Sequence, residues 1–233
     1  MENAKLGFGI MTLPRMNAAD DGSMGMLELN RMVDLFLKSG YTYFDASYAY
    51  QGMQGEKAAA ECLVKRHPRE WFSLASKLHY SAFDSADDVE KVFNEQRKNA
   101  EVEIFDHYML HDIDEKSCEK YKKYRCFEWM QKKRSEGLIK HAGISFTGDA
   151  AFLDRLLNEY PRMGFVQIRM NSLEAQNREK AMDIFECAAA HSVPVIVTSD
   201  DTDVIRYAMG FPEVMYAVAG IKSMKMLKEL KED

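Results

Sequence analysis

The chain has 233 residues, of which 46% are hydrophobic and 29% are charged, a balance typical of globular proteins that bury a sizeable core. Its formal net charge is −6, and no basic run offsets it, which argues against nucleic-acid and anionic-membrane partners. The four cysteines form no CxxC pair, so no zinc site, iron–sulfur cluster or other metal centre is indicated.

The N-terminus shows no basic segment followed by an apolar stretch, the pattern of a secretory signal. No apolar run approaches the ~20 residues of a membrane span. We therefore expect a cytoplasmic protein with free thiols.

Short apolar runs alternate with amphipathic stretches along the whole chain. In chain order, the predicted strands are residues 6–11, 43–45, 72–77, 104–111, 139–145, 165–169, 193–198 and 215–219. The predicted helices are residues 26–39, 56–65, 85–100, 115–136 with a break near Tyr124-Arg125, 149–159, 178–191, 201–209 and 224–231. Gly40 is the expected C-cap of the first helix.

This alternation predicts an α/β protein, a (βα)8 TIM barrel, as one domain over residues 1–233. No linker rich in Pro, Gly or Ser interrupts it. A doubly wound sheet is the alternative, but the GxGxxG fingerprint is absent.

Ionisable residues stand at the predicted ends of three consecutive strands. Asp45 ends the second, Lys77 the third and His111 the fourth, while Tyr50 follows Asp45 by five residues. Barrel enzymes carry their catalytic residues at the carboxyl ends of strands. The four residues together suggest chemistry at that face.

Their chemistry suits protonation of an oxygen atom. An ammonium such as that of Lys77 favours the phenolate of a neighbouring tyrosine and so makes the Tyr50 proton easier to release. Asp45 would keep a buried Lys77 charged, and His111 could orient a carbonyl oxygen by donating a hydrogen bond. None of these groups is a hydride source, so a cofactor must bring the reducing equivalent.

The chain resembles the aldo-keto reductase family. The resemblance spans Met1 to about Val197 and rests on Leu6-Gly7-Phe8-Gly9, Phe44-Asp45-Ala46, Tyr50, Gly55-Glu56, Ala75-Ser76-Lys77, Phe105-Asp106, Leu110-His111, Gly137 to Phe146, Val166-Gln167 and Asn171. The segments Gly143 to Phe146 and Phe165 to Gln167 look most like the subgroup with a C-terminal ferredoxin-like extension. That extension and its cysteines are missing here, which shortens the C-terminal region.

The resemblance implies NAD(P)H-dependent reduction of a small aldehyde or ketone, with Tyr50 as general acid assisted by Lys77, Asp45 and His111. It implies that Ser145 and Gln167 contact the nicotinamide carboxamide and that Met11 lies near the nicotinamide. NADPH is the expected cofactor and NADH is possible. The carbonyl substrate and the oligomeric state are not indicated.

The chain departs from the family after its seventh strand. The family has a loop there that covers the cofactor pyrophosphate, whereas this chain has Asp200, Asp201 and Asp203, which would oppose the phosphates or simply begin a helix. Lys222 and Ser223 stand where the family often binds the adenosine 2′-phosphate, although a lysine-rich helix is also an ordinary solvated surface.

Two alternatives remain at the level of sequence. The four residues can be the machinery of a reductase, or a buried polar network in a barrel that binds a ligand or partner without hydride transfer. A metal bound by both His107 and His111 is disfavoured, because four residues of strand separate them by about 13 Å. Asp112 and Asp114 are expected to be loop residues, and His79 a surface or packing residue.

Overall fold

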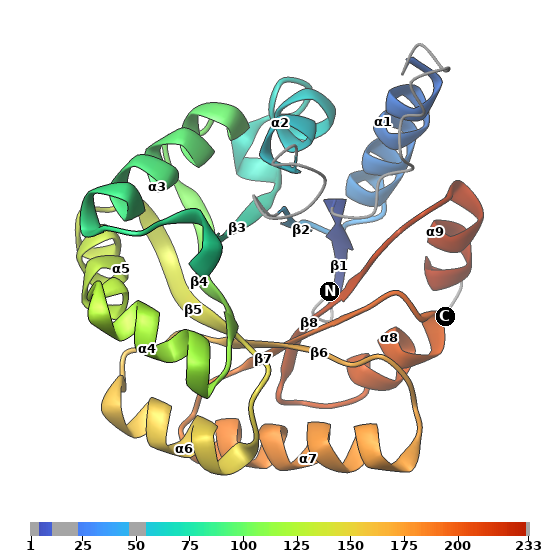
Figure 1. The fold of residues 1–233 in the computed structure, drawn as a ribbon. Coiled ribbons are helices and arrows are strands. Elements are labelled where there is room, and N and C mark those ends of the chain that lie inside the picture. The colour runs from blue at the N-terminus through green and yellow to red at the C-terminus, as the bar shows by residue number, and fades with distance from the viewer. Residues whose placement is uncertain (1–4, 11–22, 47–54, 232–233) are drawn as a thin grey trace.

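Eight parallel strands close into a barrel, and helices cover its outside (Figure 1). The structure, a computed structural model, describes residues 5–10, 23–46 and 55–231. The strands are β1 (Leu6–Gly9), β2 (Tyr43–Asp45), β3 (Ser73–His79), β4 (Phe105–Ile113), β5 (Ile139–Phe146), β6 (Val166–Arg169), β7 (Val195–Ser199) and β8 (Val214–Ala219). They pair in sequential order, and β8 pairs with β1, so the predicted (βα)8 fold is confirmed.

The helices follow the predicted alternation. They are α1 (Ser23–Lys38), α2 (Gly55–Ala59) with a π-helical turn at Ala60–Val64, α3 (Ala86–Ala100), α4 (Glu115–Lys123), α5 (Cys126–Ser135), α6 (Ala150–Glu159), α7 (Ala175–Ala190), α8 (Thr202–Met209) and α9 (Met224–Lys231). Short 3-10 turns occupy Arg69–Trp71 and Tyr80–Ala82. None of the helices in the described part of the chain is long and apolar enough to cross a bilayer.

Local sequence signals account for several helix ends. The side chains of Ser85, Asp114, Asp149 and Asp201 accept hydrogen bonds from backbone N–H groups in the first turns of α3, α4, α6 and α8. Gly40 follows α1 with a φ of 87°, which confirms the predicted C-cap. The predicted break near Tyr124-Arg125 is also confirmed, because Arg125 has a φ of 54° between α4 and α5.

Strands β3 and β4 extend two residues beyond the predicted ends at Lys77 and His111. The β3–β4 ladder continues through His79 and His111, and buried Leu78 and Leu110 make the longer pairing favourable. The prediction ended these strands at the ionisable residues Lys77 and His111, whereas a side chain pointing into a barrel mouth leaves the backbone free to continue the ladder. β6 begins one residue later than predicted, and β7 begins two residues later and ends one residue later; β1 ends at Gly9, and the predicted strand end at Met11 lies outside the described residues.

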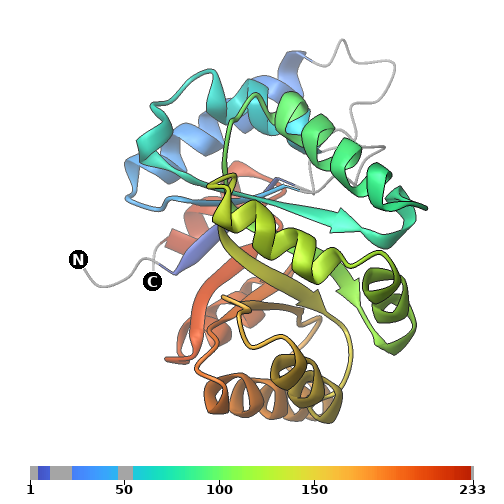
Figure 2. The ribbon, with the colours of Figure 1, turned by 90° about the vertical axis from the view of Figure 1, so that its left-hand side faces the viewer.

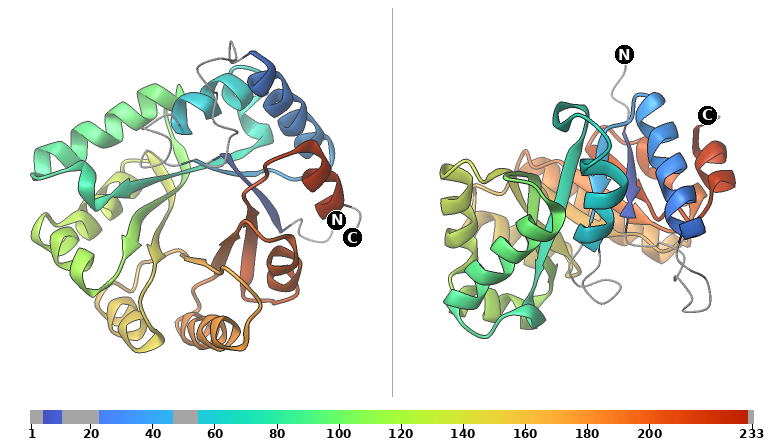
Figure 3. Two further views of the ribbon diagram at one scale, coloured as in Figure 1. Left: turned by 45° about the vertical axis from the view of Figure 1, so that its right-hand side comes forward. Right: turned by 90° about the horizontal axis from the view of Figure 1, so that it is seen from above.

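The strands run in one direction, so their carboxyl ends share one face of the barrel (Figure 2). The barrel interior holds a small buried cluster whose members come from several strands and from the residue before β6: Tyr43, Ala75, Met109, Phe165, Ile196 and Val218. A larger cluster fills the space between strands and helices. On the outer surface of the barrel, next to the paired strands β1 and β8, the helices α1 and α9 lie side by side (Figure 3).

Candidate active site at the carboxyl ends of the strands

Asp45 and Lys77 form a buried ion pair at the end of β2. Their side chains are 0% and 1% exposed, and the Lys77 Nζ donates a hydrogen bond to Asp45 Oδ1. Gln167 Nε2 on β6 donates to the other carboxylate oxygen, Oδ2, at 2.6 Å. Both oxygens of a carboxylate removed from water therefore have donors, which offsets much of the cost of burying the charge.

Ser145 and Gln167 are neighbours in the β5–β6 ladder, and both are buried. The family resemblance suggested a carboxamide contact for both. The bond from Gln167 to Asp45 is a contact that the sequence analysis missed, because residues from strands so far apart in sequence meet only when the barrel closes.

His111 lies in the same mouth, at register with His79 on β3. Its backbone N–H donates to the Tyr121 hydroxyl at 3.2 Å, and that hydroxyl lies 2.8 Å from the Leu78 carbonyl oxygen. Burial, and then the positive charge of Lys77, lower the pKa of His111 well below its ordinary value. The imidazole is therefore neutral at pH 7 and can donate from one ring nitrogen while the other accepts.

A polar network behind β3 supports the backbone at Lys77. Gln96 Nε2 on α3 donates to the Lys77 carbonyl at 2.8 Å, and Tyr108 Oη donates to Gln96 Oε1 at 2.6 Å. The Ser76 hydroxyl donates to the buried Glu56 at 2.7 Å, and burial raises the pKa of that carboxyl group. The network ties β3 to α2, α3 and β4 and so fixes where Lys77 projects.

Tyr50 and Met11 lie outside the described residues. Among the other predicted site residues, Asp45, Lys77, His111, Ser145 and Gln167 share the inward face of their strands. Alternation of side chains along a strand makes this grouping predictable from sequence.

Two of the three acids after β7 have basic partners. Asp200 Oδ2 pairs with Arg169 Nη2 at 2.9 Å and lies 3.8 Å from Lys222 Nζ, while Asp203 pairs with Arg206 at 3.3 Å. Asp201 caps α8, which was one of the two roles considered from the sequence.

Lys222 and Ser223 lie between β8 and α9. The Lys222 side chain is 56% exposed, and the Ser223 hydroxyl accepts a hydrogen bond from the Met226 N–H at the start of α9. A capping role for Ser223 and the Asp200 contact of Lys222 are therefore present without a ligand.

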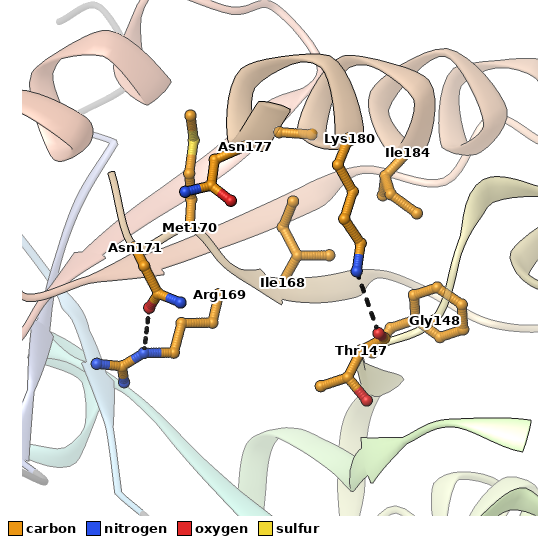
Figure 4. A pocket seen from close by; sticks show the side chains of 11 residues that line it. Thr147, Gly148, Ile168, Arg169, Met170, Asn171, Asn177, Lys180 and Ile184 are labelled. Atoms are coloured by element: carbon orange, nitrogen blue, oxygen red, sulfur yellow. Dashed lines mark hydrogen bonds between the residues drawn. The ribbon is translucent and has the colours of Figure 1, made fainter. Parts of the chain in front are cut away.

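A cavity of about 270 Å³ lies between the ends of β5 and β6 and the helix α7 (Figure 4). Ile168 and Ile184 give it an apolar wall, and Lys180 Nζ reaches the Thr147 carbonyl oxygen at 3.4 Å across it. Of the predicted site residues that the structure describes, none lines this cavity.

Two residues at the mouth were not expected to be functional. His79 and Asp112 both approach His111, with ring centroids of the two histidines 5.3 Å apart. For His79 the signal was available, since it stands two positions after Lys77 and shares its face of β3. The expectation that Asp112 is a loop residue is wrong, because it lies within β4, at an irregularity of the pairing with β5 that the sequence pattern does not indicate.

The family model described as the aldo/keto reductase family matches residues 5–200 of the chain. A search of curated proteins found no match.

Solved structures share the fold at low sequence identity. An aldo-keto reductase from Pseudomonas aeruginosa has a TM-score of 0.76 at 21% identity, covering 98% of this chain and 87% of its own. One from Bacillus halodurans has a TM-score of 0.73 at 18% identity, covering 98% and 85%. One from Klebsiella pneumoniae, in complex with NADPH, has a TM-score of 0.66 at 16% identity, covering 97% and 83%.

Proposed function

The chain belongs to the aldo/keto reductase family, and from that premise we propose that it is an NAD(P)H-dependent oxidoreductase that reduces an aldehyde or ketone to an alcohol. The observation that carries the proposal is the buried Asp45–Lys77 pair beside a neutral His111. A buried charge pair is costly to maintain for stability alone, which favours a chemical role. We include in the proposal that residues 1–233 act as one domain in the cytoplasm.

The nicotinamide end of a dinucleotide fits the described residues. Ser145 and Gln167 are adjacent polar side chains beside Asp45, in register on neighbouring strands. The phosphate end fits less closely, because Lys222 is near Asp200 and two further acids, Asp201 and Asp203, stand at the start of α8. NADPH is the proposed cofactor and NADH the second choice. When bound, the cofactor would supply the hydride that reduces the carbonyl carbon.

The protein's own groups would handle the oxygen. Tyr50 is the proposed general acid, whose hydroxyl proton passes to the carbonyl oxygen as the alcohol forms. Lys77 would stabilise the resulting phenolate, with Asp45 holding the ammonium in place and Gln167 donating to the Asp45 carboxylate. His111, being neutral, would donate a hydrogen bond to the carbonyl oxygen and orient it.

The alternative is a barrel of this family that binds a ligand or partner without hydride transfer. The acidic segment around Asp200 favours it, since carboxylates near a pyrophosphate weaken its binding. The neutralisation of Asp200 by Arg169 reduces this objection.

The deciding experiment is a titration of the purified protein with NADPH and with NADH, followed by cofactor fluorescence. The proposal expects saturable binding at micromolar concentration, and tighter binding of NADPH if Lys222 and Ser223 bind the 2′-phosphate. A panel of aldehydes and ketones would then be tested for cofactor oxidation. Absence of binding of either dinucleotide up to about 1 mM would overturn the proposal in favour of the alternative.

The Tyr50→Phe variant tests the proton donor. Removing a general acid slows a reaction by about 10²- to 10⁴-fold, so we expect a loss of kcat in that range with nearly unchanged cofactor affinity. Reduction at the original rate in this variant would show that another group supplies the proton.

A further inference from the structure

At the end of strand β4 the pairing with β5 is irregular, and two consecutive residues of β4 lie opposite a single residue of β5. Leu110 pairs with Ile144 and Ile113 with Phe146, so His111 and Asp112 together stand opposite the single residue Ser145. This is a β-bulge, a feature that redirects side chains and is frequent beside active sites. Asp112 also has a φ of 51°, a left-handed conformation.

His79 completes a group of three potential ligands. It faces His111 across the β3–β4 ladder, and its Nε2 lies 3.7 Å from Asp112 Oδ2. His111 Nε2 lies 3.5 Å from Asp112 Oδ1. One ligand atom from each residue can be chosen so that all three lie within 4.8 Å of one another.

We propose that His79, His111 and Asp112 form a binding site for a divalent transition-metal ion of the Zn²⁺ or Co²⁺ class. Two imidazoles and one carboxylate suit such ions. Zn²⁺ holds nitrogen and oxygen ligands at about 2.0–2.2 Å, so the three atoms must approach one another by roughly 1 Å. Partly exposed His79 and Asp112, whose side chains are 17% and 43% exposed, can make that movement while His111 stays in place.

The protonation states suit metal binding. Burial lowers the pKa of His79 and of His111, which favours the neutral imidazole, the form that binds metal ions. His79 Nδ1 accepts from the Ser81 N–H at 3.2 Å and lies 2.7 Å from the Ser81 hydroxyl. A metal on Nε2 would shift the ring proton to Nδ1, where the hydroxyl oxygen can accept it in place of the N–H contact.

The positive charge of Lys77 is the main electrostatic factor that disfavours a cation at this site. Its ammonium acts on both His111 and Asp112, but its ion pair with Asp45 compensates much of that charge. Asp112 brings a carboxylate that neutralises part of the incoming charge. With these opposing charges, we expect the affinity for the ion to be lower than in a structural zinc site.

Metal binding would oppose the proposed reduction. A metal on His111 Nε2 would occupy a ring nitrogen at the mouth and compete with the carbonyl oxygen for that position. This consequence rests on the proposed function, whereas metal binding itself does not.

The test is binding of Co²⁺ and of Zn²⁺ to the full chain, followed by cobalt visible absorption and by calorimetry. A second cluster, Asp154, Cys187 and His191, gives the matched control. The proposal expects one ion whose affinity falls at least about tenfold in His79→Gln and in Asp112→Asn and is unchanged in His191→Gln. Circular dichroism would verify that each variant is folded.

Several outcomes would overturn the site: no binding, equal affinity in the wild type and in His79→Gln, or loss of binding in His191→Gln with a thiolate-to-cobalt band in the wild type. Inhibition of carbonyl reduction by Zn²⁺ in the wild type and its relief in His79→Gln would support the link to the reductase. If dinucleotide binding fails while the cobalt spectrum behaves as expected, the proposed function is lost and the metal site stands.

Discussion

At the scale of single residues, the Asp45–Lys77 pair dominates the electrostatics of the barrel mouth. Its two charges are removed from water and are compensated by each other and by the Gln167 amide. Such a pair adds little stability when intact, but removing one partner leaves a buried charge with insufficient compensation. The pair is therefore sensitive to changes on either side.

Lys77→Met should destabilise the fold by about 3–5 kcal/mol, because the Asp45 carboxylate would keep only the Gln167 donor among its described partners. Chemical denaturation of the folded protein measures this change. Lys91→Met is the control, since Lys91 is 75% exposed and pairs with Asp88 at the surface; its cost should stay within about 0.5 kcal/mol.

The double variant Asp45→Asn with Lys77→Met should be less destabilised than the sum of the two single variants, because it buries no charge at this position. Additive losses would show that packing of the lysine stem, and not its charge, sets the cost.

The sequence was informative about single residues at strand ends. Asp45, Lys77 and His111 were grouped because each ends one of three consecutive predicted strands, and the structure places all three on neighbouring strands near those ends. The Gln167 contact to Asp45 was missed because it depends on how β2 and β6 are oriented across the barrel interior. Contacts across the interior leave no periodic pattern in the sequence.

At the scale of elements, strand β5 shows how close packing selects a glycine. A Cβ added to Gly143 would lie 2.6 Å from the Phe165 carbonyl oxygen and 2.7 Å from its ring. The absence of a side chain therefore lets Phe165 fill the barrel interior beside β5.

Gly143→Ala should destabilise the protein by about 1–3 kcal/mol, because the strand backbone must shift to relieve the overlap. Gly25→Ala in α1 is the matched control, since its added Cβ has no described atom within 4 Å apart from its own stretch of helix, and it should stabilise by about 0.5–1 kcal/mol. Thermal unfolding of both variants measures the two changes in stability. Equal and small effects would mean that β5 adapts without cost.

Element order was predictable, but the exact ends of strands were not. Hydrophobic periodicity identified every strand that the structure describes, and capping residues such as Asp149 marked helix starts. The extension of β4 to Ile113 and its bulge at His111-Asp112 depend on pairing with β5, which a single strand does not encode. Two of the three candidate metal ligands, His111 and Asp112, lie at that bulge.

At the scale of the whole molecule, buried histidines set the response to acid. His107 is packed among Tyr43, His141, Phe165 and Tyr216, and burial, reinforced by His141, lowers its pKa to about 4. An unfolded histidine has a pKa of about 6.5. Between these values the unfolded chain binds a proton that the folded protein does not, so stability falls as the pH decreases from about 6.5 toward 4.

The loss should approach about 1.4 kcal/mol for each pH unit from His107 alone, with a further contribution from His111. Denaturation at pH 7, 6 and 5 measures the slope. Glu56, whose pKa is raised by burial, acts in the opposite direction, so the wild type is best compared with His107→Phe. That variant should have a shallower slope; an identical slope would assign the acid sensitivity to other groups.

The pairing of β1 with β8 has a consequence for how the barrel forms. Leu6 of β1 pairs with Ala217 of β8, so the pairing that closes the barrel joins segments from opposite ends of the described chain. Closing so long a loop is entropically costly, whereas each strand, helix and next strand can associate locally. We therefore expect the barrel to assemble first as an open, curved sheet and to seal late at this junction. The exposed edges of β1 and β8 would be the points at which two unfinished copies can join by mistake.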